Sequence, residues 1–61
     1  MNAKQLVKQA QQNPQQPVWA GEAVVIIANS DGTISVTDNG EEVVCNSADE
    51  AVEVVKENLG Q

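Results

Sequence analysis

The dipeptide Asn39-Gly40 constrains the fold most strongly, because two short segments that alternate apolar and polar residues flank it. Asn-Gly is the strongest short-range signal for a hairpin with a two-residue turn. With this turn, Ile34 lies opposite Cys45 and Val36 lies opposite Val43. Opposite residues of an antiparallel pair share a face, so all four apolar side chains fall on one side of the hairpin. The predicted strands are residues 33–37 and 41–45.

Residues 18–28 predict a further strand, because four consecutive β-branched residues occupy positions 24–27. The turn-forming residues 29–32 separate this strand from the next one. A loop of two or four residues at this point would place Val25 and Ile27 on the core face. The predicted core face then consists of Val25, Ile27, Ile34, Val36, Val43 and Cys45. The opposite face would expose Val24, Ile26 and Val44.

Helices are expected at both ends of this strand region. Residues 2–12 place apolar side chains at the i, i+3, i+4, i+7 spacing of one helical face, and Asn2 and Gln5 have the spacing of a capping box. Pro14 ends this helix, and the proline-containing residues 13–17 predict a stiff, extended linker. A second amphipathic helix is expected over 47–59, with Ser47 and Glu50 as its capping box.

The predicted fold is therefore a single α+β domain over residues 1–61, a helix followed by a three-stranded antiparallel meander and a closing helix (αβββα). The simplest arrangement packs both helices on the core face. The alternative is a sandwich in which the first helix covers the opposite face. In the first arrangement an apolar face stays exposed, and we expect an interface there formed by Trp19, Val24, Ile26 and Val44. Trp19 itself could instead fill the core or its rim.

Composition excludes most chemistry from this chain of 61 residues. It contains no histidine and one cysteine, so it lacks the commonest general base and cannot close an internal disulfide. Its glycines match no phosphate-binding loop and its acids match no EF-hand spacing. We expect no catalytic residue, no metal and no cofactor, and hence no enzyme. No apolar run is long enough for a membrane span or a secretory signal, so we expect a cytoplasmic location.

Charge is distributed unevenly along the chain, whose formal net charge is −6. Residues 1–21 carry two lysines and no acid, whereas residues 22–61 carry all nine acids and only Lys56. Such a surface repels nucleic acids and anionic membranes and favours a basic protein partner. Its simpler interpretation is that the charge keeps the chain in solution. The candidate partner-binding acids are Asp31, Asp38, Glu41, Glu42, Asp49, Glu50, Glu53 and Glu57.

In layout the chain resembles the anti-CRISPR proteins, small acidic inhibitors from phages and mobile elements. The shared features are Met1-Asn2 with Leu6-Val7-Lys8, the Ser30-Asp31-Gly32 turn, three strands and a closing helix. This resemblance implies that acids spaced along the surface mimic the phosphates of DNA and occupy a basic groove.

Two functions are thus predicted. The first is a non-enzymatic acidic module that binds a basic, nucleic-acid-binding protein, in its sharpest form as an inhibitor that mimics nucleic acid. The alternative is a structural or accessory subunit that self-associates, for example as a homodimer, through the exposed face of its sheet.

Overall fold

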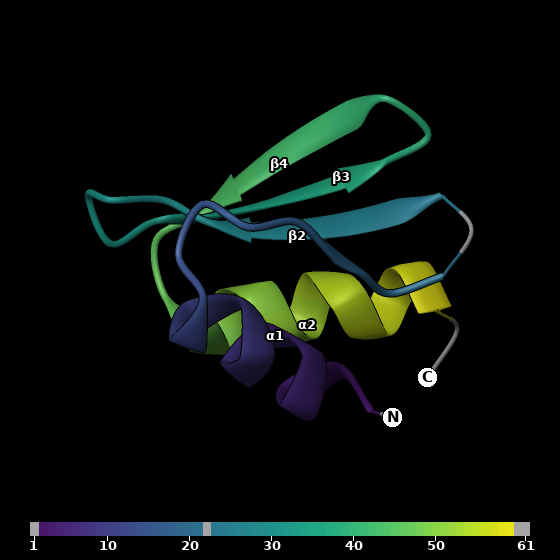
Figure 1. The fold of residues 1–61 in the computed structure, drawn as a ribbon. Helices are drawn as coiled ribbons and strands as arrows, with labels where there is room; N and C mark the ends of the chain where they lie inside the picture. Colours follow the sequence, from purple (N-terminus) through teal and green to yellow (C-terminus); the bar gives the residue numbers. More distant parts are fainter. Residues whose placement is uncertain (1, 22, 60–61) are drawn as a thin grey trace.

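The chain forms a small α+β domain in which a four-stranded antiparallel sheet lies over two helices (Figure 1). The computed structural model describes residues 2–21 and 23–59, so Met1 and Glu22, which the predicted motifs and strands include, lie outside it. The strands follow one another in the sheet in chain order. In order, the elements are α1 (Ala3–Gln12), β1 (Val18–Trp19), β2 (Val24–Ala28), β3 (Ile34–Asp38), β4 (Glu41–Cys45) and α2 (Ala48–Leu59).

The hairpin of β3 and β4 has the register that the sequence predicts. Ile34 pairs with Cys45 and Val36 pairs with Val43. Asn39 and Gly40 have φ values of 52° and 86°. Two successive positive φ angles define the type I′ turn, whose twist matches that of the flanking strands.

The expected strand over residues 18–28 is two strands, which corrects the three-stranded meander to a four-stranded sheet. The chain turns back after Trp19, and the backbone N–H of Ala20 donates to the carbonyl of Val24 at 2.8 Å. Val18 therefore pairs with Ile26, and Trp19 pairs with Val25. A chain this short buries more apolar surface by folding a long segment back onto itself than by leaving it as an overhang.

The face assignment of β2 is also corrected. Ala28 pairs with Ile34, so the loop between them has five residues, 29–33. An odd-numbered loop reverses the parity that a two- or four-residue loop would give. Val24 and Ile26, expected on the exposed face, are 5 % and 0 % exposed in the core. Val25 and Ile27 lie on the other side of the sheet and are half-buried.

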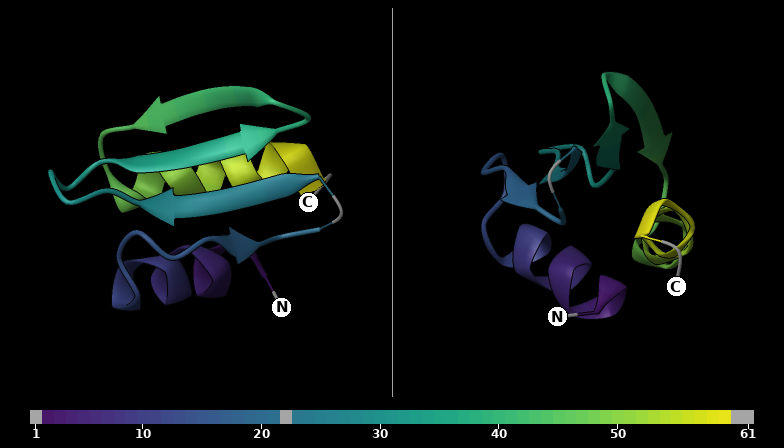
Figure 2. Two further views of the ribbon diagram at one scale, coloured as in Figure 1. Left: turned by 45° about the horizontal axis from the view of Figure 1, so that its top comes forward. Right: turned by 90° about the vertical axis from the view of Figure 1, so that its right-hand side faces the viewer.

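Both helices cover the same face of the sheet, which confirms the simpler of the two predicted arrangements. α1 packs against β1 and β2, and α2 packs mainly against β3 (Figure 2, right). Their buried faces complete the core with the strand residues. The helix residues buried there are Ala3, Leu6, Val7, Ala10, Ala51 and Val55.

Side chains cap both helices: α1 has the complete capping box that the sequence predicts, and α2 has only the Ser47 half of it. The Asn2 side chain accepts a hydrogen bond from the N–H of Gln5 at 2.9 Å, and the Gln5 side chain accepts one from the N–H of Asn2 at 3.4 Å. At α2, the hydroxyl of Ser47 accepts from the N–H of Glu50 at 3.2 Å, whereas the Glu50 carboxylate accepts from Asn46 at 3.3 Å. These bonds satisfy amide groups that a helix leaves without partners.

The segment after α1 is a compact turn rather than the extended linker that its prolines predict. Gln15 has a φ of 67°, and its N–H donates to the carbonyl of Ala28 at 2.8 Å. The turn thereby ties the end of α1 to the end of β2 and aligns the following residues with β2 as an edge strand.

Candidate functional site

One face of the sheet carries no helix (Figure 2, left). We call it the outer face, and it bears exposed apolar side chains that do not belong to the core. Its residues follow from the strand register, since opposite residues share a face. One row across the strands runs from Trp19 through Val25 and Thr37 to Glu42, and the next contains Ile27, Ser35 and Val44.

Large apolar side chains lie open on this face. Trp19 is 60 % exposed and Val44 is 55 % exposed. Val25 and Ile27, on β2 next to Trp19, are half-buried. Ser35 and Thr37 of β3 separate them from Val44. Aromatic residues are enriched in the binding hot spots of protein interfaces. The structure thus places Trp19 as a side chain of the outer face and not as a core filler.

A polar cluster closes one end of the outer face. The side-chain amide of Asn29 donates to the hydroxyls of Thr33 and Ser35, each at 3.0 Å. Ser35 is buried as a result, although the outer face bears no helix. In residues 2–21 and 23–59, every buried side-chain nitrogen or oxygen has a hydrogen-bond partner. The cluster therefore stabilises the loop of residues 29–33 internally.

The structure distributes the candidate acids over three regions and does not gather them into one surface. Asp31 lies in the loop between β2 and β3, and its pKa is lowered because the hydroxyl and N–H of Thr33 donate to its carboxylate. Asp38, Glu41 and Glu42 lie at the tip of the hairpin, at the opposite end of the strands. The remaining acids, Asp49, Glu50, Glu53 and Glu57, are exposed along α2.

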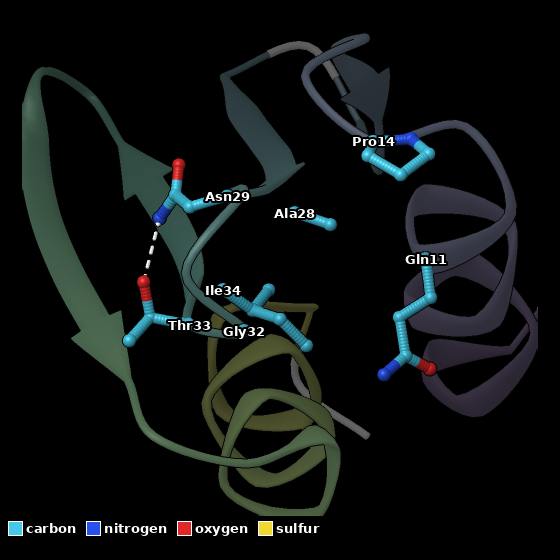
Figure 3. A pocket seen from close by; sticks show the side chains of 7 residues that line it. All are labelled: Gln11, Pro14, Ala28, Asn29, Gly32, Thr33 and Ile34. Carbon is cyan, nitrogen blue, oxygen red and sulfur yellow. Dashed lines mark hydrogen bonds between the residues drawn. The ribbon is translucent and has the colours of Figure 1, made fainter.

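A small cavity lies between the end of α1 and the loop between β2 and β3 (Figure 3). Its volume is about 180 Å³, whereas pockets that hold small molecules usually enclose about 300–1,000 Å³. Gln11 contributes a polar side chain from α1. On the opposite wall, the side chains of Asn29 and Thr33 are hydrogen-bonded to each other. The lining residues are Gln11, Pro14, Ala28, Asn29, Gly32, Thr33 and Ile34.

A larger groove of about 360 Å³ runs between the two helices. Val7, Ala48 and Val52 contribute its apolar lining. Lys4 and Lys8 of α1 and Asp49 of α2 contribute charges of both signs. The two lysines outnumber the one aspartate, so the groove is only weakly positive.

Cys45 is the single cysteine of the chain, and its side chain is buried on the helix side of the sheet. Burial raises the pKa of its thiol, and the negative charge of Glu50 raises it further. A buried thiol with a raised pKa carries little thiolate and reacts slowly. Within the described part of the chain, no three histidine, cysteine, aspartate or glutamate residues are grouped so as to hold a metal ion.

Of the four residues expected at an apolar interface, the structure brings Trp19 and Val44 to the outer face and withdraws Val24 and Ile26 into the core. Val25 and Ile27 take their places on this face. The number of residues in the loop between β2 and β3 decides whether Val24 and Ile26 or Val25 and Ile27 face the helices. Five residues lie between the paired Ala28 and Ile34.

In the residues that the structure describes, no helix is long and apolar enough to cross a lipid bilayer. Comparisons with protein-family models, with curated proteins and with solved structures give no match to this chain.

Proposed function

We propose that this chain is a non-enzymatic protein-interaction module that binds a basic protein through the outer face of its sheet. The observation that carries the proposal is the exposure of Trp19, which is 60 % accessible beside Val25 and Ile27 on a face that no helix covers and that also exposes Val44 on its far edge strand. Burying the part of each large apolar side chain that is still exposed would contribute about 1 kcal/mol, roughly half of what full burial gives.

Charge supports a basic partner over a second copy of the chain. Asp31 lies beyond one end of the outer face, and Asp38, Glu41 and Glu42 lie at the other. A second copy stacked on this face would bring a further net charge of −6 against the first. In a partner whose apolar patch is surrounded by lysine and arginine, these basic side chains would be attracted to the carboxylates at both ends of the outer face.

Capture from cell lysate by the immobilised chain tests the proposal. Trp19→Thr removes the indole and keeps a good strand-forming residue, and Gln12→Ala, on the exposed side of α1, is the matched control. We expect Gln12→Ala to retain a basic protein that Trp19→Thr loses, with capture weakening between about 50 and 200 mM salt as ion pairs are screened. Equal capture by Trp19→Thr and the original chain would refute the proposal.

Mimicry of nucleic acid is the second candidate, and the acids of α2 favour it. Asp49, Glu53 and Glu57 follow one another at four-residue intervals on the exposed side of the helix, which spaces them by about 6 Å along the axis. Such a row offers a basic groove a line of carboxylates in place of phosphates.

The same capture experiment separates the two candidates. Glu53→Lys with Glu57→Lys reverses charge on α2 and spares Glu50, whose carboxylate accepts from Asn46. Loss of capture in this variant alone identifies α2 as the contact surface. Loss in Trp19→Thr alone identifies the outer face.

A further inference from the structure

The two edges of the sheet differ in how they are protected. β1 is only two residues long and follows Pro17, which has no N–H to offer. β4 has five residues, of which the first four are exposed. It contains neither the proline nor the lysine with which proteins usually block an edge strand.

The hydrogen-bond pattern shows which groups of β4 lack a partner strand. The N–H of Asn29 donates to the carbonyl of Thr33, so the backbone of Thr33 faces β2. Backbone direction alternates along a strand. Ile34, Val36 and Asp38 therefore face β4 and engage its residues 45, 43 and 41. The N–H and C=O groups of Glu42 and Val44 consequently point away from the sheet.

Side chains beside this edge are apolar on both faces of the sheet. Val44 is 55 % exposed on the outer face. Val43 belongs to the helix side by register, yet it is 45 % exposed, because α2 packs mainly under β3. The position next to β4 thus offers two unpaired peptide groups and one apolar side chain above and one below.

The negative charge along the edge of β4 determines which kind of strand can pair with it. Glu41 and Glu42 lie at the hairpin end of β4, on opposite faces of the sheet, and both are exposed. A second copy paired along β4 would add two more glutamates to the same edge. A strand that carries lysine or arginine would instead place a cation opposite a carboxylate.

We propose that the outward edge of β4 accepts an extended, basic segment of another protein as a fifth strand. Main-chain hydrogen bonds to Glu42 and Val44 hold the segment, its apolar residues cover Val43 and Val44, and its basic residues meet Glu41 and Glu42. Strand addition of this kind draws affinity from the backbone and specificity from alternate side chains. It does not depend on binding at the outer face.

A short peptide with blocked ends, in which two adjacent valines precede two adjacent lysines, is the probe, because adjacent residues of a strand point to opposite faces of the sheet. We expect amide hydrogen exchange at Glu42 and Val44 to slow by about tenfold or more on peptide addition, because their N–H groups become bonded. Val43, already bonded to β3, should change less. The same peptide with glutamate in place of lysine should leave exchange unaltered, and slowing by both peptides alike would refute charge selection.

Val44→Pro removes one outward N–H and should weaken peptide binding about tenfold, whereas the matched Val44→Thr keeps the N–H and should bind nearly as well. If Val44→Pro fails to fold, two N-methylated peptides provide the test in its place. One carries the methyl groups on the amides that point toward β4, and the other carries them on the amides that point away from it. Methylation on the edge that meets β4 should abolish binding, and methylation on the opposite edge should not. Equal binding by both would overturn the proposal.

Two further outcomes would also overturn it. If amide exchange at Glu42 and Val44 becomes slower as the protein concentration is raised in the absence of peptide, the occupant of the edge is a second copy of the chain. Peptide binding that shifts Trp19 fluorescence and leaves the amides of Glu42 and Val44 unchanged would place the peptide on the outer face. That result would leave the function proposed above intact.

Discussion

The two faces of β2 are nearly alike in sequence and unlike in environment. Along β2, Val24 and Ile26 point toward the helices while Val25 and Ile27 point to the outer face. The inner pair is buried, and the outer pair is only half-buried. The same two side-chain types therefore stabilise the core on one face and remain available for contact on the other. Hydrophobicity alone therefore does not mark a core position along this strand.

Adjacent isoleucines provide the strongest test of this difference. Ile26→Ala should cost about 2–5 kcal/mol because it opens a cavity among buried side chains, whereas Ile27→Ala should cost about 1 kcal/mol for a half-buried side chain. A domain of 61 residues has only a few kcal/mol in total at about 0.05–0.15 kcal/mol per residue. Urea unfolding followed by circular dichroism measures both, and equal costs would contradict the assigned faces.

Cys45 reports the inner face through pH. Burial raises the pKa of the thiol above its ordinary 9.0, so the unfolded chain ionises first. The contribution of the thiol to stability is fully present below pH 9.0 and is lost as the pH rises through the raised pKa. We expect the urea midpoint of the original chain to fall more between pH 8 and 10 than that of Cys45→Ala. Identical pH profiles would show that the thiol reaches solvent.

Trp19 reports the outer face and should contribute little to stability. Trp19→Thr is expected to change the free energy of unfolding by about 0.5 kcal/mol or less, as for other exposed positions. In dilute solution, acrylamide should quench the fluorescence of Trp19 nearly as readily as that of free tryptophan. Strong protection from quenching in the monomer would mean that some other part of the chain covers this face.

The smallest effect is expected at Asp31, beyond the end of both faces. Its pKa lies below the ordinary 3.8 because the hydroxyl of Thr33 donates to the carboxylate at 2.6 Å and the N–H of Thr33 donates at 3.0 Å. The resulting stability is present above pH 3.8 and is lost as the pH falls through the lowered pKa. The urea midpoints of the original chain and Asp31→Asn should thus converge on acidification, and a constant difference would contradict this account.

Local turn chemistry made half of the sheet predictable. Asn39 and Gly40 admit one tight turn, and the alternation on either side agrees with its register. The caps at Asn2 and Ser47 were predictable for the same reason, because a single side chain close in sequence satisfies the first amides of each helix.

Long-range choices were not predictable in this way. Residues 29–33 contain several good turn formers, and pattern alone did not indicate a five-residue loop closed by the bond from Asn29 to Thr33. Residues 18–28 gave no strong hairpin dipeptide, so the reversal after Trp19 depends on packing against α1 and β2. For the candidate site, Val44 is exposed as predicted, whereas the choice of Val24 and Ile26 was wrong because it inherited the incorrect loop parity. The sequence left open whether Trp19 lies on the exposed face or fills the core, and the structure exposes it.

The length of the loop of residues 29–33 determines which face of β2 points toward the helices. A single-residue deletion there would turn the strand over and offer Val25 and Ile27 to the helices in place of Val24 and Ile26. Because the exchanged side chains are chemically identical, the core would lose little in volume. The length of a surface loop therefore sets which face of β2 is buried.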